Sequence, residues 1–150
     1  MDYKNLSDAE LGIFLLTYSQ SMEEFIIDSL SDQVDEPGSL YKPAMKSFLL
    51  YCLSIVLNDY YPNVDSMIVK ILDEIGSEID MYASSVFPQS RSAKTEMLSA
   101  FKEYKRLENS YGLNSVNKIE EAFAKNVYRH GNINADGILE AILNPLRKEF

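Results

Sequence analysis

The segment at residues 131–143 reads GNINADGILEAIL and comes closer to a chemical motif than any other stretch of this chain. Asn132, Asn134 and Asp136 stand at alternate positions before a glycine, as oxygen ligands do in an EF-hand calcium loop. Such a loop supplies a bidentate glutamate at its twelfth position, and that position here is Leu143. We therefore expect no metal site. Asn134 is predicted to cap a helix that has Asp136 in its first turn.

Residue types that commonly carry catalysis are scarce. The single histidine, His130, precedes a glycine at the expected end of a helix, where the helix dipole favours a cation. The single cysteine, Cys52, has no lysine or arginine within five residues, so a buried and unreactive thiol is predicted. The chain has no His–Cys zinc set, no paired Glu-x-x-His motif and no glycine-rich phosphate loop. These observations predict a protein without enzymatic activity, cofactor or metal.

The sequence also bears on the expected compartment. One cysteine cannot form an intrachain disulfide, and the first ten residues lack the basic and apolar regions of a secretory signal. The most apolar run, at residues 48–57, is ten residues long, whereas a membrane-spanning helix needs about 20. We expect a cytoplasmic protein that does not associate with a membrane.

The net charge of −9 is unevenly distributed. Residues 1–91 hold 15 acidic and 5 basic residues, whereas residues 92–150 hold 8 acidic and 9 basic residues. An acidic surface repels phosphate, so nucleic acid is not an expected partner. Neighbouring carboxylates such as Glu120 and Glu121 point apart on a helix and are expected on solvated faces. The acidic surface is interpreted first as a source of solubility, and the alternative is a docking face for a basic protein, comprising Glu23, Glu24, Asp28, Asp32, Asp35 and Glu36.

Apolar periodicity predicts an all-α fold. Residues 1–150 are expected to form a single domain, a bundle of about six helices that are mostly antiparallel to their neighbours, with a minor break at 87–92. A capping box at Ser7–Glu10 starts the first helix. The helices are predicted at residues 8–30, 43–60, 64–86, 93–111 and 115–130, and from about residue 135 onward.

Two glycines within these helices carry specific expectations. Gly76 interrupts the third helix at a cost of about 1 kcal/mol relative to alanine, which either a close crossing helix or a tolerated surface position would explain. Gly112 is expected to end the fourth helix and to let Leu113 fold back onto Leu107.

The second helix has almost no face suited to water. Residues 44–57 read AMKSFLLYCLSIVL, in which Lys46, Ser47 and Ser54 are the polar side chains. Five further helices in a chain of this length provide little material to surround it. We therefore expect a homodimer with this helix at the seam, and a central helix in a monomer is the alternative. The expected interface residues are Tyr51, Tyr60 and Tyr61.

Three functional hypotheses follow. The first, favoured because apolar helix surface is abundant and catalytic groups are absent, is a non-enzymatic helical protein that binds other proteins or itself. The second is an acidic mimic of nucleic acid, or an inhibitor of a basic partner. The third is a helical sensor of a small ligand, which the ten tyrosines would suit.

Overall fold

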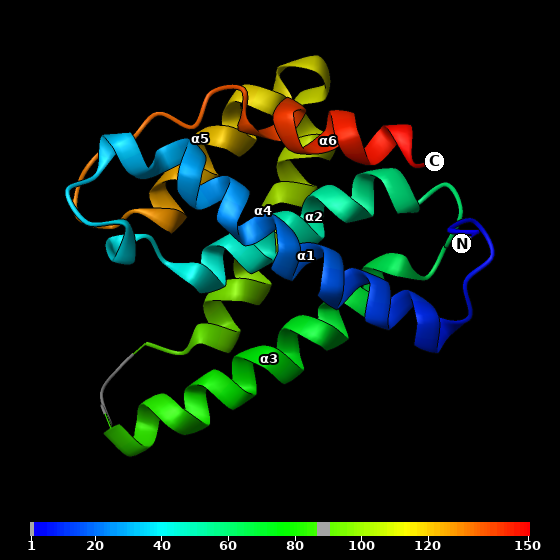
Figure 1. The fold of residues 1–150 in the computed structure, drawn as a ribbon, viewed down its shortest axis with the longest axis horizontal. Helices are drawn as coiled ribbons and strands as arrows, with labels where there is room; N and C mark the ends of the chain where they lie inside the picture. Colours follow the sequence, from blue (N-terminus) through cyan, green and yellow to red (C-terminus); the bar gives the residue numbers. More distant parts are fainter. Residues whose placement is uncertain (1, 87–90) are drawn as a thin grey trace.

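The computed structural model describes residues 2–86 and 91–150, so most of the expected break at 87–92 lies outside the described residues. The all-α fold is confirmed, and the described part of the chain has no β-strand (Figure 1). The α-helices are α1 (Asp8–Leu30), α2 (Lys42–Leu57), α3 (Val64–Val86), α4 (Ala93–Tyr111), α5 (Ser115–Val127) and α6 (Ile138–Lys148). Short 3-10 turns connect some of them: η1 (Ser31–Gln33), η2 (Pro37–Ser39) and η3 (Gly112–Asn114).

Local signals place most helix ends where they were predicted. The side chain of Ser7 accepts the Glu10 N–H at 3.2 Å while Glu10 accepts the Ser7 N–H at 3.0 Å, so the capping box is confirmed. Gly112 follows α4 with a φ of 54°, a conformation that favours glycine. The predicted contact of Leu113 with Leu107 is wrong, because Leu113 lies in η3 and is fully exposed.

Helix α2 is the centre of the core. Twelve of its sixteen residues are buried, and it packs against α1, α3, α4, α5 and α6 of the same chain. The ring of Phe48 stacks on Phe123 of α5 at 4.0 Å and meets Tyr104 of α4 edge-on at 5.6 Å. The buried Ser47 hydroxyl donates to the Met97 carbonyl of α4 at 2.7 Å, so this polar group is satisfied within the core.

The chain itself therefore buries most of α2, the arrangement that was given above as the alternative to a seam between two copies. Tyr51 is buried beside the core aromatic rings, and Tyr61 is buried with its hydroxyl bonded to the Tyr3 carbonyl and the Leu6 N–H. Tyr60 is partly exposed, and its ring stacks on Phe150. One copy of the chain encloses α2, so burial of this helix provides no reason for dimerisation.

Helices α3 and α4 cross closely at Gly76. A Cβ atom added to this glycine would lie 2.8 Å from the backbone nitrogen of Lys94 and would overlap its Cα. Close approach of a crossing helix, rather than a tolerated surface position, therefore explains this mid-helix glycine. Beyond the crossing, α3 extends away from the other helices (Figure 1). In this part of α3, the side chain of Tyr82 is 74% exposed.

No helix among the described residues has the length and apolar character needed to cross a membrane.

Candidate functional site

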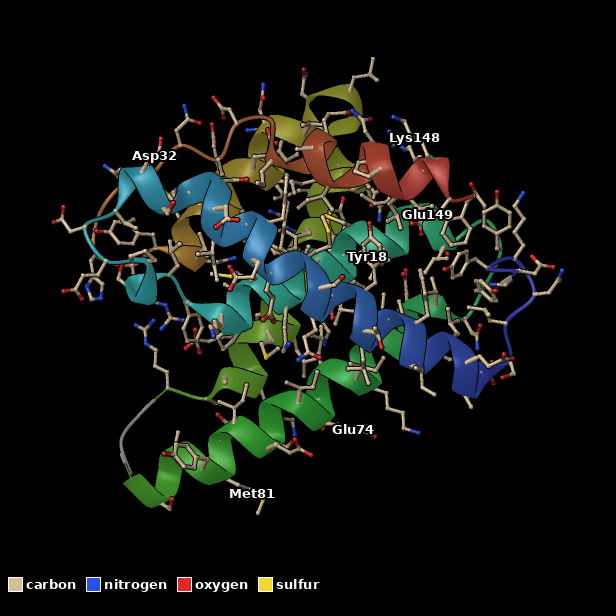
Figure 2. The ribbon with its side chains drawn as sticks, viewed as in Figure 1. Tyr18, Asp32, Glu74, Met81, Lys148 and Glu149 are labelled. Carbon is tan, nitrogen blue, oxygen red and sulfur yellow. The ribbon has the colours of Figure 1, made fainter. Side chains whose placement is uncertain are left out.

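A polar groove of about 540 Å³ lies between the end of α1 and the segment that leads into α6. We call it the acidic groove because Asp32 lines one side, Asp136 lines the other, and no basic residue contributes to its lining. Figure 2 shows Asp32 at the outer edge of the bundle, beyond the end of α1. The groove lining comprises Ser29, Leu30, Asp32, Gln33, Asn134, Ala135, Asp136, Gly137, Ile138 and Ala141.

A pair of hydrogen bonds joins the two sides of the acidic groove. The Gln33 amide nitrogen donates to the Asn134 carbonyl at 2.7 Å, and the Asn134 N–H donates to the Gln33 side-chain oxygen at 2.6 Å. The two residues are 101 positions apart in the sequence. This pair of hydrogen bonds, which we call the Gln33–Asn134 tie, holds Asp32 and Asp136 along one groove. No local sequence signal could have indicated this long-range contact.

The residues of the expected acidic docking face differ in exposure and in ion pairing. Glu24, Asp28, Asp32, Asp35 and Glu36 are exposed, and none of them forms an ion pair within the described part of the chain. Glu23 does not belong with them, because its carboxylate binds the Lys46 ammonium group at 2.7 Å and is largely covered. The structure places Asp136 in the same groove as one of these acids, Asp32.

The segment that resembles a calcium loop has a different local structure. The Asn134 side-chain oxygen accepts the Asp136 N–H at 2.8 Å, so it is already engaged inside the loop. Leu143, at the position of the bidentate glutamate, is 3% exposed and belongs to the core. Among the described residues, no group of three or more histidine, cysteine or acidic side chains is arranged to hold a metal ion.

The predicted Asn134 cap on the last helix is wrong. Helix α6 begins only at Ile138, after Gly137, whose φ of 85° turns the chain into the helix. The Glu120 carboxylate of α5 takes the capping role, accepting the Leu139 N–H at 3.0 Å. Glu120 is 2% exposed, so its expected solvated position is also wrong, whereas Glu121 is exposed.

The scarce reactive groups lie apart from the groove. Burial raises the pKa of the Cys52 thiol well above its usual range, and the side chain lies in the core. His130 is exposed three residues beyond the end of α5, with its ring edge-on to Tyr128 at 6.2 Å. Within the described residues, neither side chain forms a hydrogen bond with a second group that could act with it as a nucleophile–base pair.

Comparison of the chain with protein-family models, with curated proteins and with solved structures found no match.

Proposed function

We propose that this protein acts by binding a basic segment of another protein at the acidic groove. The observation that supports this function is the Gln33–Asn134 tie, which places the exposed Asp32 and Asp136 on opposite sides of one groove. A lysine- or arginine-rich segment lying in the groove can meet carboxylates on both sides. The proposed function is binding alone and includes no chemical step.

The charge distribution also supports a basic partner. The net charge of −9 attracts a cationic segment over a distance, and the exposed acids between Glu24 and Glu36 contribute to it. Complementary charge raises the rate of association and selects against acidic partners. Because these carboxylates are exposed, each new ion pair contributes about 0.2–1 kcal/mol, and the affinity falls as salt increases.

The experiment uses a dye-labelled peptide of alternating lysine and alanine, with fluorescence anisotropy as the measure of binding to the full chain. The double variant Asp32→Asn/Asp136→Asn removes one charge from each side of the groove. We expect its dissociation constant to increase about three- to tenfold, corresponding to roughly 1 kcal/mol. The affinity of the unchanged protein should also weaken between 0.05 and about 0.15 M salt.

A matched control separates the groove from general attraction. Glu74→Gln/Glu121→Gln changes the net charge by the same amount at exposed positions outside the groove. This control should bind the peptide within about twofold of the unchanged protein. Equal weakening in both double variants would attribute binding to overall charge and refute the groove as the site.

A further inference from the structure

A second and larger hollow, of about 910 Å³, lies between α4 and α5. We call it the α4–α5 groove. Small side chains leave this space open, since Ser99 and Ala100 line it from α4 and Ala122 lines it from α5. The α4 residues that line it run from Thr95 to Glu103, a length of about 12 Å at 1.5 Å per residue. About four residues of an extended peptide fit along that length.

The α4–α5 groove differs in charge from the rest of this acidic protein. Arg91, Lys125 and Arg129 line it together with two carboxylates, Glu96 and Glu103. Both carboxylates already have cationic partners: Glu96 pairs with Arg129, and Glu103 accepts two hydrogen bonds from Arg106, at 2.6 and 2.9 Å. Arg91 and Lys125 are exposed and form no ion pair within the described residues, so they remain available to an anionic ligand.

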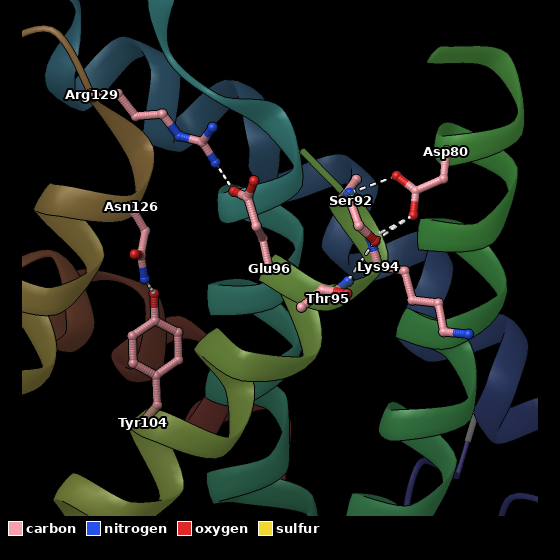
Figure 3. A network of polar contacts seen from close by, with 9 residues as sticks. Asp80, Ser92, Lys94, Thr95, Glu96, Tyr104, Asn126 and Arg129 are labelled. Atoms are coloured by element: carbon pink, nitrogen blue, oxygen red, sulfur yellow. Dashed lines mark hydrogen bonds and ion pairs between the residues drawn. The ribbon is translucent and has the colours of Figure 1, made fainter. Parts of the chain in front are cut away.

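Arg129 is held in place before any ligand arrives. Its guanidinium lies 3.9 Å from the centroid of the Tyr41 ring. The same group forms an ion pair with the Glu96 carboxylate (Figure 3). The backbone N–H of Tyr41 in turn donates to the Val127 carbonyl at 2.8 Å, which fixes the ring against the end of α5. A guanidinium has five N–H donors, so the pair with Glu96 leaves others free to bind a carboxylate.

We propose that the α4–α5 groove binds a short acidic peptide segment of a partner protein. Carboxylates of the segment would meet Arg91, Lys125 and the remaining donors of Arg129. A peptide suits the groove better than a bare inorganic anion, because the exposed carboxylate of Glu103 repels an anion but can accept a hydrogen bond from a peptide N–H group. The segment would lie along Ser99, Ala100 and Ala122, the small residues that form the floor of the groove.

The N-terminus of α4 is not the source of this anion preference. Its first N–H groups are already bonded, since the Asp80 carboxylate accepts from Ala93 and Lys94 while the Ser92 hydroxyl accepts from Thr95 (Figure 3). The binding energy must therefore come from the side chains that line the groove. This second site is independent of the acidic groove, because the two take partners of opposite charge.

The test measures binding of an eight-residue peptide of alternating glutamate and alanine, labelled with a neutral dye, to the full chain. At about 0.15 M salt the repulsion from distant acids is screened beyond roughly 8 Å, so contacts in the groove dominate. We expect binding to weaken about three- to tenfold in Arg91→Gln/Lys125→Gln. Ala122→Leu should weaken it comparably, because the larger side chain fills the floor while the charge stays the same.

Two controls make the outcome decisive. Lys42→Gln/Lys70→Gln carries the same charge change at exposed positions outside the groove and should bind within about twofold of the unchanged protein. Melting curves of all variants establish that each is folded. The proposal is overturned if the control pair weakens binding equally, if Ala122→Leu has no effect, or if inorganic phosphate displaces the peptide at equal concentration. Failure of the lysine peptide at the acidic groove leaves this result unaffected.

Discussion

Gly76 of α3 lies directly against the backbone of Lys94 in α4, with room for hydrogen but none for a Cβ atom. A helix normally gains stability when alanine replaces a glycine at its centre, by about 1 kcal/mol. At this position the added methyl group would overlap the Lys94 Cα and force the two helices apart. The contact therefore predicts that the usual effect of this substitution is reversed.

We expect Gly76→Ala to lower the free energy of unfolding by about 1–3 kcal/mol, the range typical of overpacking. Urea denaturation measures the change. The matched control is Gly12→Ala in α1, where an added Cβ would have no neighbour within 4 Å. That variant should gain about 0.5–1 kcal/mol. A Gly76→Ala protein as stable as Gly12→Ala would contradict the observed packing of α3 on α4.

Asp80 is predicted to stabilise the start of α4 from outside that helix. Its carboxylate accepts from the Ser92 hydroxyl at 2.7 Å and from the backbone N–H groups of Ala93 and Lys94 at 2.6 and 3.2 Å. Loss of a helix cap costs about 0.5–2 kcal/mol, so Asp80→Ala should destabilise the protein by that amount at pH 7. Glu78→Ala, an exposed neighbour on α3, is the control and should change stability by less than about 0.5 kcal/mol.

The Asp80 effect should depend on pH. Desolvation by itself would raise the pKa of Asp80, but the hydrogen bonds from Ser92, Ala93 and Lys94 outweigh it and lower the pKa below its ordinary value of 3.8. A carboxyl group with a lowered pKa in the folded state stabilises the fold above its ordinary pKa and loses that effect as the pH falls through the lowered value. The stability difference between the unchanged protein and Asp80→Ala should therefore be full at pH 6 and shrink below about pH 4. A difference that stays constant down to pH 2 would refute the ionised cap.

Glu120 belongs to α5, but its predicted structural role is to cap the start of α6. Removing its buried carboxylate leaves the Leu139 N–H without a partner, at a cost of about 1–3 kcal/mol. Thermal or urea denaturation of Glu120→Ala should show this loss. The adjacent Glu121→Ala, exposed on the same helix, should be nearly neutral. Equal stability of the two variants would show that the Glu120 cap contributes nothing.

These residues also mark how far the sequence can predict this fold. Signals within a few positions are reliable here: Ser7 with Glu10 locates the start of α1, and Gly112 locates the end of α4. Glu120 resembles Glu121 in the sequence, and only the docking of α6 decides which of them is buried. The start of α6 was predicted too early for the same reason, since its cap comes from Glu120 on another helix instead of the local Asn134.

What covers α2 could not be predicted from the sequence for a related physical reason. Its composition correctly indicates a helix without a solvated face, but the sequence does not specify what covers it. Five helices of the same chain do so, with Ser47 satisfied by the Met97 carbonyl. The acidic docking face was predicted from residues 23–36 alone, and its opposite side at Asp136 became visible only through the contact between Gln33 and Asn134.

The last prediction tests that contact without changing any charge. Gln33→Ala removes both hydrogen bonds to the Asn134 backbone, so Asp136 is no longer held opposite Asp32. Since both bonds are exposed, we expect stability to fall by no more than about 1 kcal/mol. Binding of the lysine–alanine peptide should weaken about threefold, because part of the binding energy must then order the groove.

Gln20→Ala, on the exposed face of α1, is the matched control and should leave both stability and binding nearly unchanged. The net charge is the same in all three proteins, so the long-range attraction of the peptide does not differ among them. A weaker affinity in Gln33→Ala alone therefore reports on the geometry of the groove. If the peptide binds Gln33→Ala as tightly as the unchanged protein, the hydrogen bonds between Gln33 and Asn134 have no role in recognition. The acidic face would then attract its partner through charge alone.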